Sequence, residues 1–243
     1  MEYEISGGNL PVVVCKLQQG ESIFTQSGGM GWFSPSFRMS TNIKGGIFKG
    51  IGRLFMKESF FMTTYKCIAP DGLIAFPSDF PGSIIMYDLK PGESIIAQKN
   101  TFLCAESTVT LSMHFKSQLM VGLFSGEGFV MQKVTGPGKV FLDIDGSTVR
   151  YLLQPGEIMM VDNSYIASLS PSVGIKMVLV KGLMNLFFSG EGMFFIELTG
   201  PGDIILQTMP IKNLAKCIAP YLHFKKSKKT DSDGSNMEYD AKV

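Results

Sequence analysis

Short apolar runs of five to eight residues, rich in Val, Ile, Phe and Met, alternate along the chain with clusters of Gly, Pro, Asn and Asp. Runs of this length between turn-forming residues are typical of β-strands. Alternation is clearest at residues 108–115, where Val109, Leu111, Met113 and Phe115 fall on one face that is predicted to meet the core. Further strands are predicted over residues 11–17, 83–89, 129–134, 148–153, 175–180 and 193–198.

Stretches of the chain repeat one another. Residues 122–142 and 186–206 are identical at 10 of 21 positions when aligned without a gap, and the Pro-Gly-Glu turns at 91–93 and 155–157 align at the same offset. A more diverged copy lies near the N-terminus, where LQQGESIF and LFMKESFF match the two kinds of turn. The repetition predicts a single β domain over residues 1–224 that contains three units, at about residues 8–80, 81–145 and 146–209.

The C-terminal part departs from the strand pattern. Apolar residues recur at helical spacing after Pro210, so a short amphipathic helix over residues 210–224 is predicted to pack on the β body. Residues 225–243 are polar and charged, with a small Lys cluster, and are predicted to be a disordered tail. The Gly-rich segment 44–55 fits either a hairpin loop or a short helix.

Charge and cysteine content narrow the functional classes. The net charge is +1, from 22 basic and 21 acidic residues, which provides no summed field to attract nucleic acid. The four cysteines form no CxxC pair and no disulfide framework, as expected in a reducing compartment. The start of the chain carries neither a secretion signal nor a transit peptide, and no apolar run approaches the roughly 20 residues of a membrane span. These features predict a cytoplasmic protein.

Several motifs carry a family resemblance, namely GESIF at 20–24, GGIFKGIGRLF at 45–55, LKPGE at 89–93, the two SGEG and TGPG pairs, and LAKCIAPYL at 214–222. In these motifs the chain resembles the altered-inheritance-of-mitochondria protein family over roughly residues 8–224. The resemblance implies a fold similar to that of the tryptophan RNA-binding attenuation protein, a β-sandwich or shortened double-stranded β-helix, repeated along one chain. It implies no reaction, and RNA binding does not follow from a shared fold.

Equivalent turns of the units carry glutamates. Glu127 and Glu191 lie in the SGEG turns, and Glu58 is their counterpart in the diverged copy, so a threefold arrangement would place three carboxylates in related positions. The alternative is structural, because a turn glutamate often accepts backbone N–H bonds or pairs with a lysine. The same two interpretations apply to Glu21, Glu93 and Glu157 in the other set of turns.

Other residues offer little chemistry. His114 and His223 are the two histidines, and both are expected at surface positions, so no catalytic, cofactor-binding or metal-binding residue is predicted. Trp32 is the one tryptophan and lies beside Phe33 in a Gly-rich loop. Simple packing is one interpretation of this residue, and the alternative is an exposed aromatic that takes part in a binding or subunit contact.

These observations favour a non-enzymatic β scaffold or binding protein that self-associates and holds a protein or small-molecule partner. A cupin-like enzyme that uses the turn carboxylates is one alternative. A membrane-associated organising protein, which would use the C-terminal helix and its Lys cluster, is another.

Overall fold

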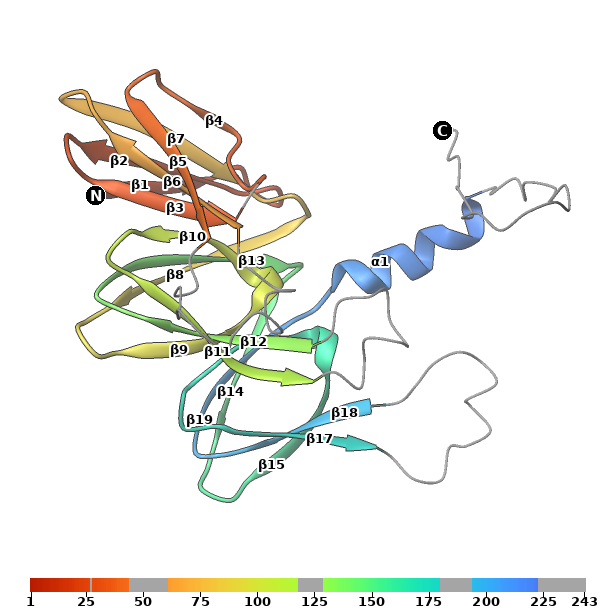
Figure 1. Cartoon of the computed structure of the whole chain (residues 1–243). Coiled ribbons are helices and arrows are strands. Elements are labelled where there is room, and N and C mark those ends of the chain that lie inside the picture. Colours follow the sequence, from red (N-terminus) through yellow and green to blue (C-terminus); the bar gives the residue numbers. More distant parts are fainter. Residues whose placement is uncertain (27, 44–60, 118–128, 180–193, 223–243) are drawn as a thin grey trace, which may run out of the picture.

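The structure is a computed structural model that describes residues 1–26, 28–43, 61–117, 129–179 and 194–222. These residues form four antiparallel sheets, named A to D here, and one short C-terminal α-helix (Figure 1). The prediction of an all-β fold with a C-terminal helix is therefore confirmed.

The strands are given in the order in which they pair. Sheet A contains β1 (Glu2–Ser6), β2 (Val12–Gln18), β7 (Asp71–Pro77) and β4 (Trp32–Phe33). Sheet B contains β5 (Phe37–Ile43), β6 (Phe61–Cys67), β3 (Ser22–Gln26), β10 (Phe102–Glu106), β13 (Gly138–Asp145) and β8 (Gly82–Leu89). Sheet C contains β11 (Thr110–Ser117), β12 (Phe129–Thr135), β9 (Ser94–Gln98), β16 (Ile166–Leu169), β19 (Gly202–Gln207) and β14 (Thr148–Leu153). Sheet D contains β15 (Ile158–Asp162), β18 (Phe194–Thr199) and β17 (Gly174–Leu179).

Short helices complete the described elements. Two 3₁₀ turns, η2 (Lys99–Thr101) and η3 (Asn163–Tyr165), each precede a strand, and α1 (Ile211–Ile218) continues into η5 (Ala219–Tyr221).

The predicted strands coincide with β2, β8, β11, β12, β14, β17 and β18, but the face assignment in β11 is partly wrong. The pairing of β11 with β12 shifts between Met113 and Phe115, which leaves His114 as an extra residue. This β-bulge moves the following side chains to the other face of the sheet. Leu111 therefore packs between sheets B and C, Phe115 packs between sheets C and D, and Met113 is half exposed.

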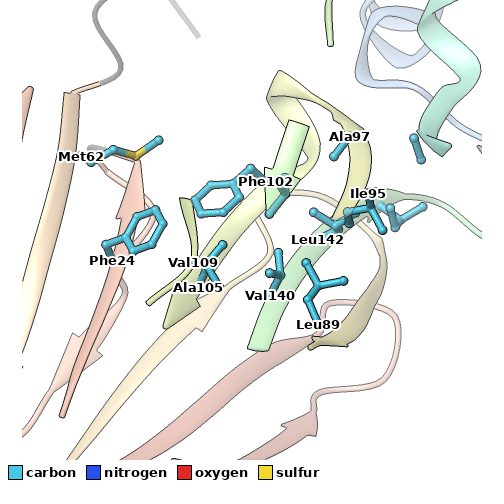
Figure 2. Close-up of a cluster of buried hydrophobic side chains, with 13 residues drawn as sticks. Phe24, Met62, Leu89, Ile95, Ala97, Phe102, Ala105, Val109, Val140 and Leu142 are labelled. Carbon is cyan, nitrogen blue, oxygen red and sulfur yellow. The ribbon is translucent and has the colours of Figure 1, made fainter. Parts of the chain in front are cut away.

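The four sheets stack with an apolar layer between each neighbouring pair. In β2, for example, Val13, Cys15 and Leu17 are fully buried in the layer between sheets A and B, while Lys16 points outward. The middle layer lies between sheets B and C (Figure 2). There the Phe24 and Phe102 rings stack with their centroids 5.5 Å apart. The packing of the four sheets therefore buries three separate apolar layers.

Sheets B and C each combine strands from two of the predicted units. β3 of the first unit pairs with β10 of the second, and β9 of the second unit pairs with β16 of the third. We call these contacts the first and the second seam. In the first seam Phe24 is opposite Ala105, and in the second Ile96 is opposite Leu169. Neighbouring predicted units are thus joined by backbone hydrogen bonds as well as by apolar packing.

The C-terminal helix forms as predicted but does not pack on the β body as expected. None of the residues of α1 is buried, and the helix projects from the sheets in Figure 1. Its base is held by the Ile211 backbone N–H, which donates to the Asp145 carboxylate at 2.8 Å, and by the Asn213 amide, which donates to the Tyr165 hydroxyl at 2.6 Å. Ile211 and Ile218 remain exposed.

Candidate functional site

Only one of the four predicted site residues falls in the described part of the chain. Glu58, Glu127 and Glu191 lie outside the described residues, as do His223, the Gly-rich segment 44–55 and the predicted tail. Trp32 lies in the two-residue strand β4, opposite Ala75, and is 51% exposed. The structure therefore places an exposed aromatic side chain at the edge of sheet A.

The second set of turn glutamates has a structural role. Each carboxylate accepts the backbone N–H of the residue three positions earlier, at 2.8 Å for Glu21 and Gln18, 2.9 Å for Glu93 and Lys90, and 2.8 Å for Glu157 and Gln154. This hydrogen bond, helped by the Met1 ammonium, lowers the pKa of Glu21. The interpretation of these three glutamates as turn caps is confirmed.

A hollow at the second seam is a candidate binding site that sequence reasoning missed. The pocket has a volume of about 300 Å³ and lies among β8, β9, β14, β16 and β19. Its apolar lining includes Ile85, Ile95 and Ile205. A concave site with an apolar lining and a few converging polar groups is the usual form of a small-molecule site.

Two hydroxyl groups meet in this pocket. The Tyr87 hydroxyl from β8 lies 2.9 Å from the Ser168 hydroxyl of β16, so a hydrogen bond connects the second and third units. Burial raises the pKa of Tyr87, although the bond to Ser168 partly opposes this shift. Tyr87 therefore stays neutral at physiological pH and can donate or accept a hydrogen bond.

An ion pair lies among the same lining residues. The Arg150 guanidinium on β14 donates its Nε–H to the Asp203 carboxylate on β19 at 2.8 Å, and Arg150 itself is 69% exposed at its side chain. This hydrogen bond holds the pKa of Asp203 below its ordinary value. The Asp203 backbone N–H donates to the Ser170 hydroxyl at 3.0 Å, which fixes the position of the strand. Because Arg150 donates to Asp203 through Nε, its terminal amino groups can reach an anionic group of a ligand.

The first seam shows which kind of group covers the position equivalent to the pocket. Phe141 on β13 holds the position in the second unit that Ile205 holds in the third, and the Tyr3 ring of β1 packs edge-on against Phe141 with centroids 5.1 Å apart. β1 pairs along β2, whereas β8, the counterpart of β2, is an edge strand of sheet B within the described chain. An aromatic side chain thus covers the first seam at the place where the second seam has its pocket.

None of these residues was singled out from the sequence. Tyr87, Arg150, Ser168 and Asp203 belong to four different strands, and no local motif links them. The one available signal is the strand pairing itself, because Arg150 is opposite Ile205 and hence diagonal to Asp203 in the antiparallel register.

Across the described ranges, no group of three or more His, Cys, Asp or Glu side chains is arranged to hold a metal ion. In that same part of the chain, no helix is both long and apolar enough to pass through a bilayer.

Comparisons with known proteins agree with this architecture. An uncharacterized protein of Streptococcus pyogenes serotype M6 is 25% identical over 219 residues, which is 87% of each chain. The crystal structure of a Streptococcus pyogenes protein from a structural genomics consortium superimposes with a TM-score of 0.73 at 22% identity, covering 91% of this chain and 99% of that one. The family described as Mitochondrial biogenesis AIM24 matches residues 3–209. The chain therefore belongs to this family.

Proposed function

We propose that this protein is a non-enzymatic, self-associating β scaffold that binds a small amphipathic carboxylate in the pocket of the second seam. The observation that carries the proposal is the pocket itself, in which apolar side chains from two units surround the Tyr87 and Ser168 hydroxyls beside Arg150. An apolar ligand body would replace the cover that Tyr3 provides at the first seam, and its carboxylate would pair with the terminal amino groups of Arg150.

The size of the pocket limits the ligand. About 300 Å³ lies at the small end of the range for ligand sites, so a ligand of roughly ten heavy atoms is a suitable probe. Aromatic and short-chain carboxylates such as phenylacetate and hexanoate have this size. Their neutral counterparts, phenylethanol and hexanol, separate the contribution of charge from that of apolar contact.

Thermal-shift titrations and calorimetry with these four compounds test the proposal. The carboxylates are expected to raise the melting temperature of the native protein, and Arg150→Gln is expected to weaken their binding at least tenfold. Arg38→Gln is the matched control, since Arg38 is an exposed arginine on β5 outside the pocket lining. Equal binding of acids and alcohols, or equal binding by native protein and Arg150→Gln, contradicts an anion-directed site.

We further propose that the scaffold consists of three related units similar in fold to the tryptophan RNA-binding attenuation protein. The three turn glutamates make the same hydrogen bond, and the spacing between the starts of β9, β10 and β11 recurs unchanged between the starts of β15, β16 and β17. The bulge in the pairing of β10 with β13 falls at Phe102 to Cys104, and that of β16 with β19 falls at the aligned positions, Ile166 to Ser168. These shared irregularities support a common unit, because bulges are position-specific features of a fold.

A second candidate function is contact with a membrane surface. The observation that favours it is the unburied helix α1, which leaves Ile211 and Ile218 exposed together with Tyr221 and Leu222 beyond it. An amphipathic helix followed by basic residues binds anionic bilayers through both apolar and electrostatic terms. Co-sedimentation with vesicles containing phosphatidylserine tests this, and Ile218→Asp/Leu222→Asp is expected to abolish it. Equal sedimentation of the double variant contradicts a role for the helix.

A further inference from the structure

Two strands that form seams within the chain have counterparts at free sheet edges. β3 and β9 directly follow the first two turn glutamates, and each is paired on both sides. β15 directly follows the third turn glutamate, Glu157, but among the described residues it is one of the two edge strands of sheet D. At the other end of the stack, β4 is one of the two edge strands of sheet A in the same described part of the chain. Sheets A and D lie at opposite ends of the molecule (Figure 1).

Apolar residues of β15 are exposed to solvent, whereas the equivalent residues of β3 and β9 are buried. Met160 lies three residues after Glu157, as Phe24 follows Glu21 and Ile96 follows Glu93. Phe24 is 0% exposed and Ile96 is 1% exposed, because each is covered by the next unit, whereas Met160 is 44% exposed. Ile158 on the same strand is 57% exposed. The outer face of β15 is thus an apolar surface of the kind that a following unit covers elsewhere in the chain.

The strand pairings identify β4 as the counterpart of β10 and β16. In sheet A, Phe33 is opposite Ile74, two residues after Gly72, and in sheet B, Ala105 is opposite Val140, two residues after Gly138. The side chain of the next residue supports this alignment. Ser34 accepts the N–H of Leu73 at 3.0 Å, and Ser170, which follows β16 as Ser34 follows β4, accepts the N–H of Asp203 at the same distance.

The alignment assigns Trp32 to the position of Cys104 and Ser168. Cys104 is 0% exposed and Ser168 is 2% exposed, because each belongs to a seam that a preceding unit completes. Trp32 is 51% exposed at the edge of sheet A, where β7 is the one described strand that pairs with β4. Trp is among the residue types most enriched at the centre of protein interfaces. A free strand edge offers unpaired backbone groups to a second chain.

We propose that β15 of one molecule pairs antiparallel with β4 of a second copy of this chain, which forms a third seam between molecules. The register follows from the two internal seams, in which Phe24 is opposite Ala105 and Ile96 is opposite Leu169. By the same rule Met160 of one molecule lies opposite Phe33 of the next. Sheet D of one molecule and sheet A of the next then form one continuous sheet. Sheets B and C are each built in the same way, from strands of two units.

The contact is heterologous, because two different edges of the molecule meet. Each molecule that uses its β15 edge still offers a free β4 edge, so association continues head to tail until a ring closes. The inference rests on the self-association in the proposed function and identifies the surfaces that carry it. It does not depend on the ligand of the second seam.

Light scattering during size-exclusion chromatography of the full chain tests the inference over a hundredfold range of concentration. The native protein is expected to exceed the monomer mass, and Met160→Asp is expected to raise the concentration for half-dissociation at least tenfold. Leu152→Asp is the matched control, since Leu152 is an apolar residue on β14 that is 62% exposed. Because Met160 and Leu152 are both exposed, neither variant should unfold, and circular dichroism melts verify this.

Disulfide trapping tests the register. Phe33→Cys/Met160→Cys, in a Cys217→Ser background that removes the exposed native thiol, is expected to give covalent multimers on oxidation. Phe33→Cys/Leu152→Cys should stay monomeric on denaturing gels. A native protein that is monomeric at every concentration overturns both the self-association and the edge pairing. An oligomer that Met160→Asp leaves intact, with no covalent multimers from the first pair, overturns the edge pairing alone.

Discussion

The buried side chain of Gln132 gives the sharpest stability prediction. Gln132 lies on β12, is 0% exposed, and has no hydrogen-bond partner for either amide atom among the described residues. Its neighbours on the same face, Val130 and Val134, are apolar and buried. The residue that aligns with it in the third unit is Ile196, which is fully buried in the layer between sheets C and D. An apolar residue therefore fits at the equivalent place in the third unit.

The magnitude follows from the cost of burying an amide without partners, which is about 1–3 kcal/mol. Methionine matches glutamine in length and flexibility, so Gln132→Met adds little strain. We expect the substitution to raise the free energy of unfolding by about 1–3 kcal/mol. In a chain of this size each kcal/mol corresponds to roughly 2–4 °C in the melting temperature.

Urea and thermal unfolding of Gln132→Met and Gln207→Met provide the test. Gln207 is also buried, at 5% exposure, but its amide donates to the Ser164 carbonyl at 2.7 Å and accepts the Asp145 N–H at 3.2 Å. Gln207→Met is therefore expected to destabilise the protein by about 1–2 kcal/mol. Equal losses of stability in the two variants would refute the reasoning, because they would mean that the Gln132 amide is satisfied.

Two further predictions concern ionisable groups. Burial raises the pKa of Asp143, and nearby carboxylates make smaller contributions in the same direction. Above about pH 4 the folded state therefore holds a proton that the unfolded chain has released. The free energy of unfolding consequently falls as the pH rises from about 4 through the folded pKa. Asp143→Asn removes this loss, so its stability relative to the native protein should be greater at pH 7 than at pH 3 in urea titrations, while a pH-independent difference would contradict it. The two turn glutamates Glu93 and Glu157 are expected to contribute equally to stability, since each makes one hydrogen bond of similar length. Glu93→Ala and Glu157→Ala should each lower the free energy of unfolding by about 1 kcal/mol in thermal melts. An unchanged melting temperature in both variants would rule out the capping role.

Local patterns in the sequence were sufficient for the seven strands named above and for one set of turns. The apolar runs and the Gly-containing turns fall where the structure has strands and reversals, because strand alternation and turn chemistry are decided within a few residues. The glutamates of the Pro-Gly-Glu type turns also behave as expected, since a carboxylate that reaches a backbone N–H three residues away needs no distant partner.

Features that depend on tertiary context could not be predicted in this way. Alternation through residues 108–115 continues unbroken in the sequence, so the extra residue at His114 is visible only in the pairing with β12. The helical pattern after Pro210 predicts an apolar face but does not indicate which surface covers this face. In the structure the β body leaves the residues of α1 unburied. The seam pocket was missed because its polar residues come from strands that only the pairing of two units brings together.

Hydrogen exchange at β15 tests the central claim, that each unit completes the sheet of its neighbour, most directly. Exchange of residues 158–162 is followed by mass spectrometry at two protein concentrations, with β9, residues 94–98, as the internal reference. The account predicts that at high concentration the amides of β15 that point away from β18 exchange as slowly as those of β9, and that dilution accelerates them without affecting β9. Rapid exchange of these amides at both concentrations, beside a slowly exchanging β9, would contradict the account.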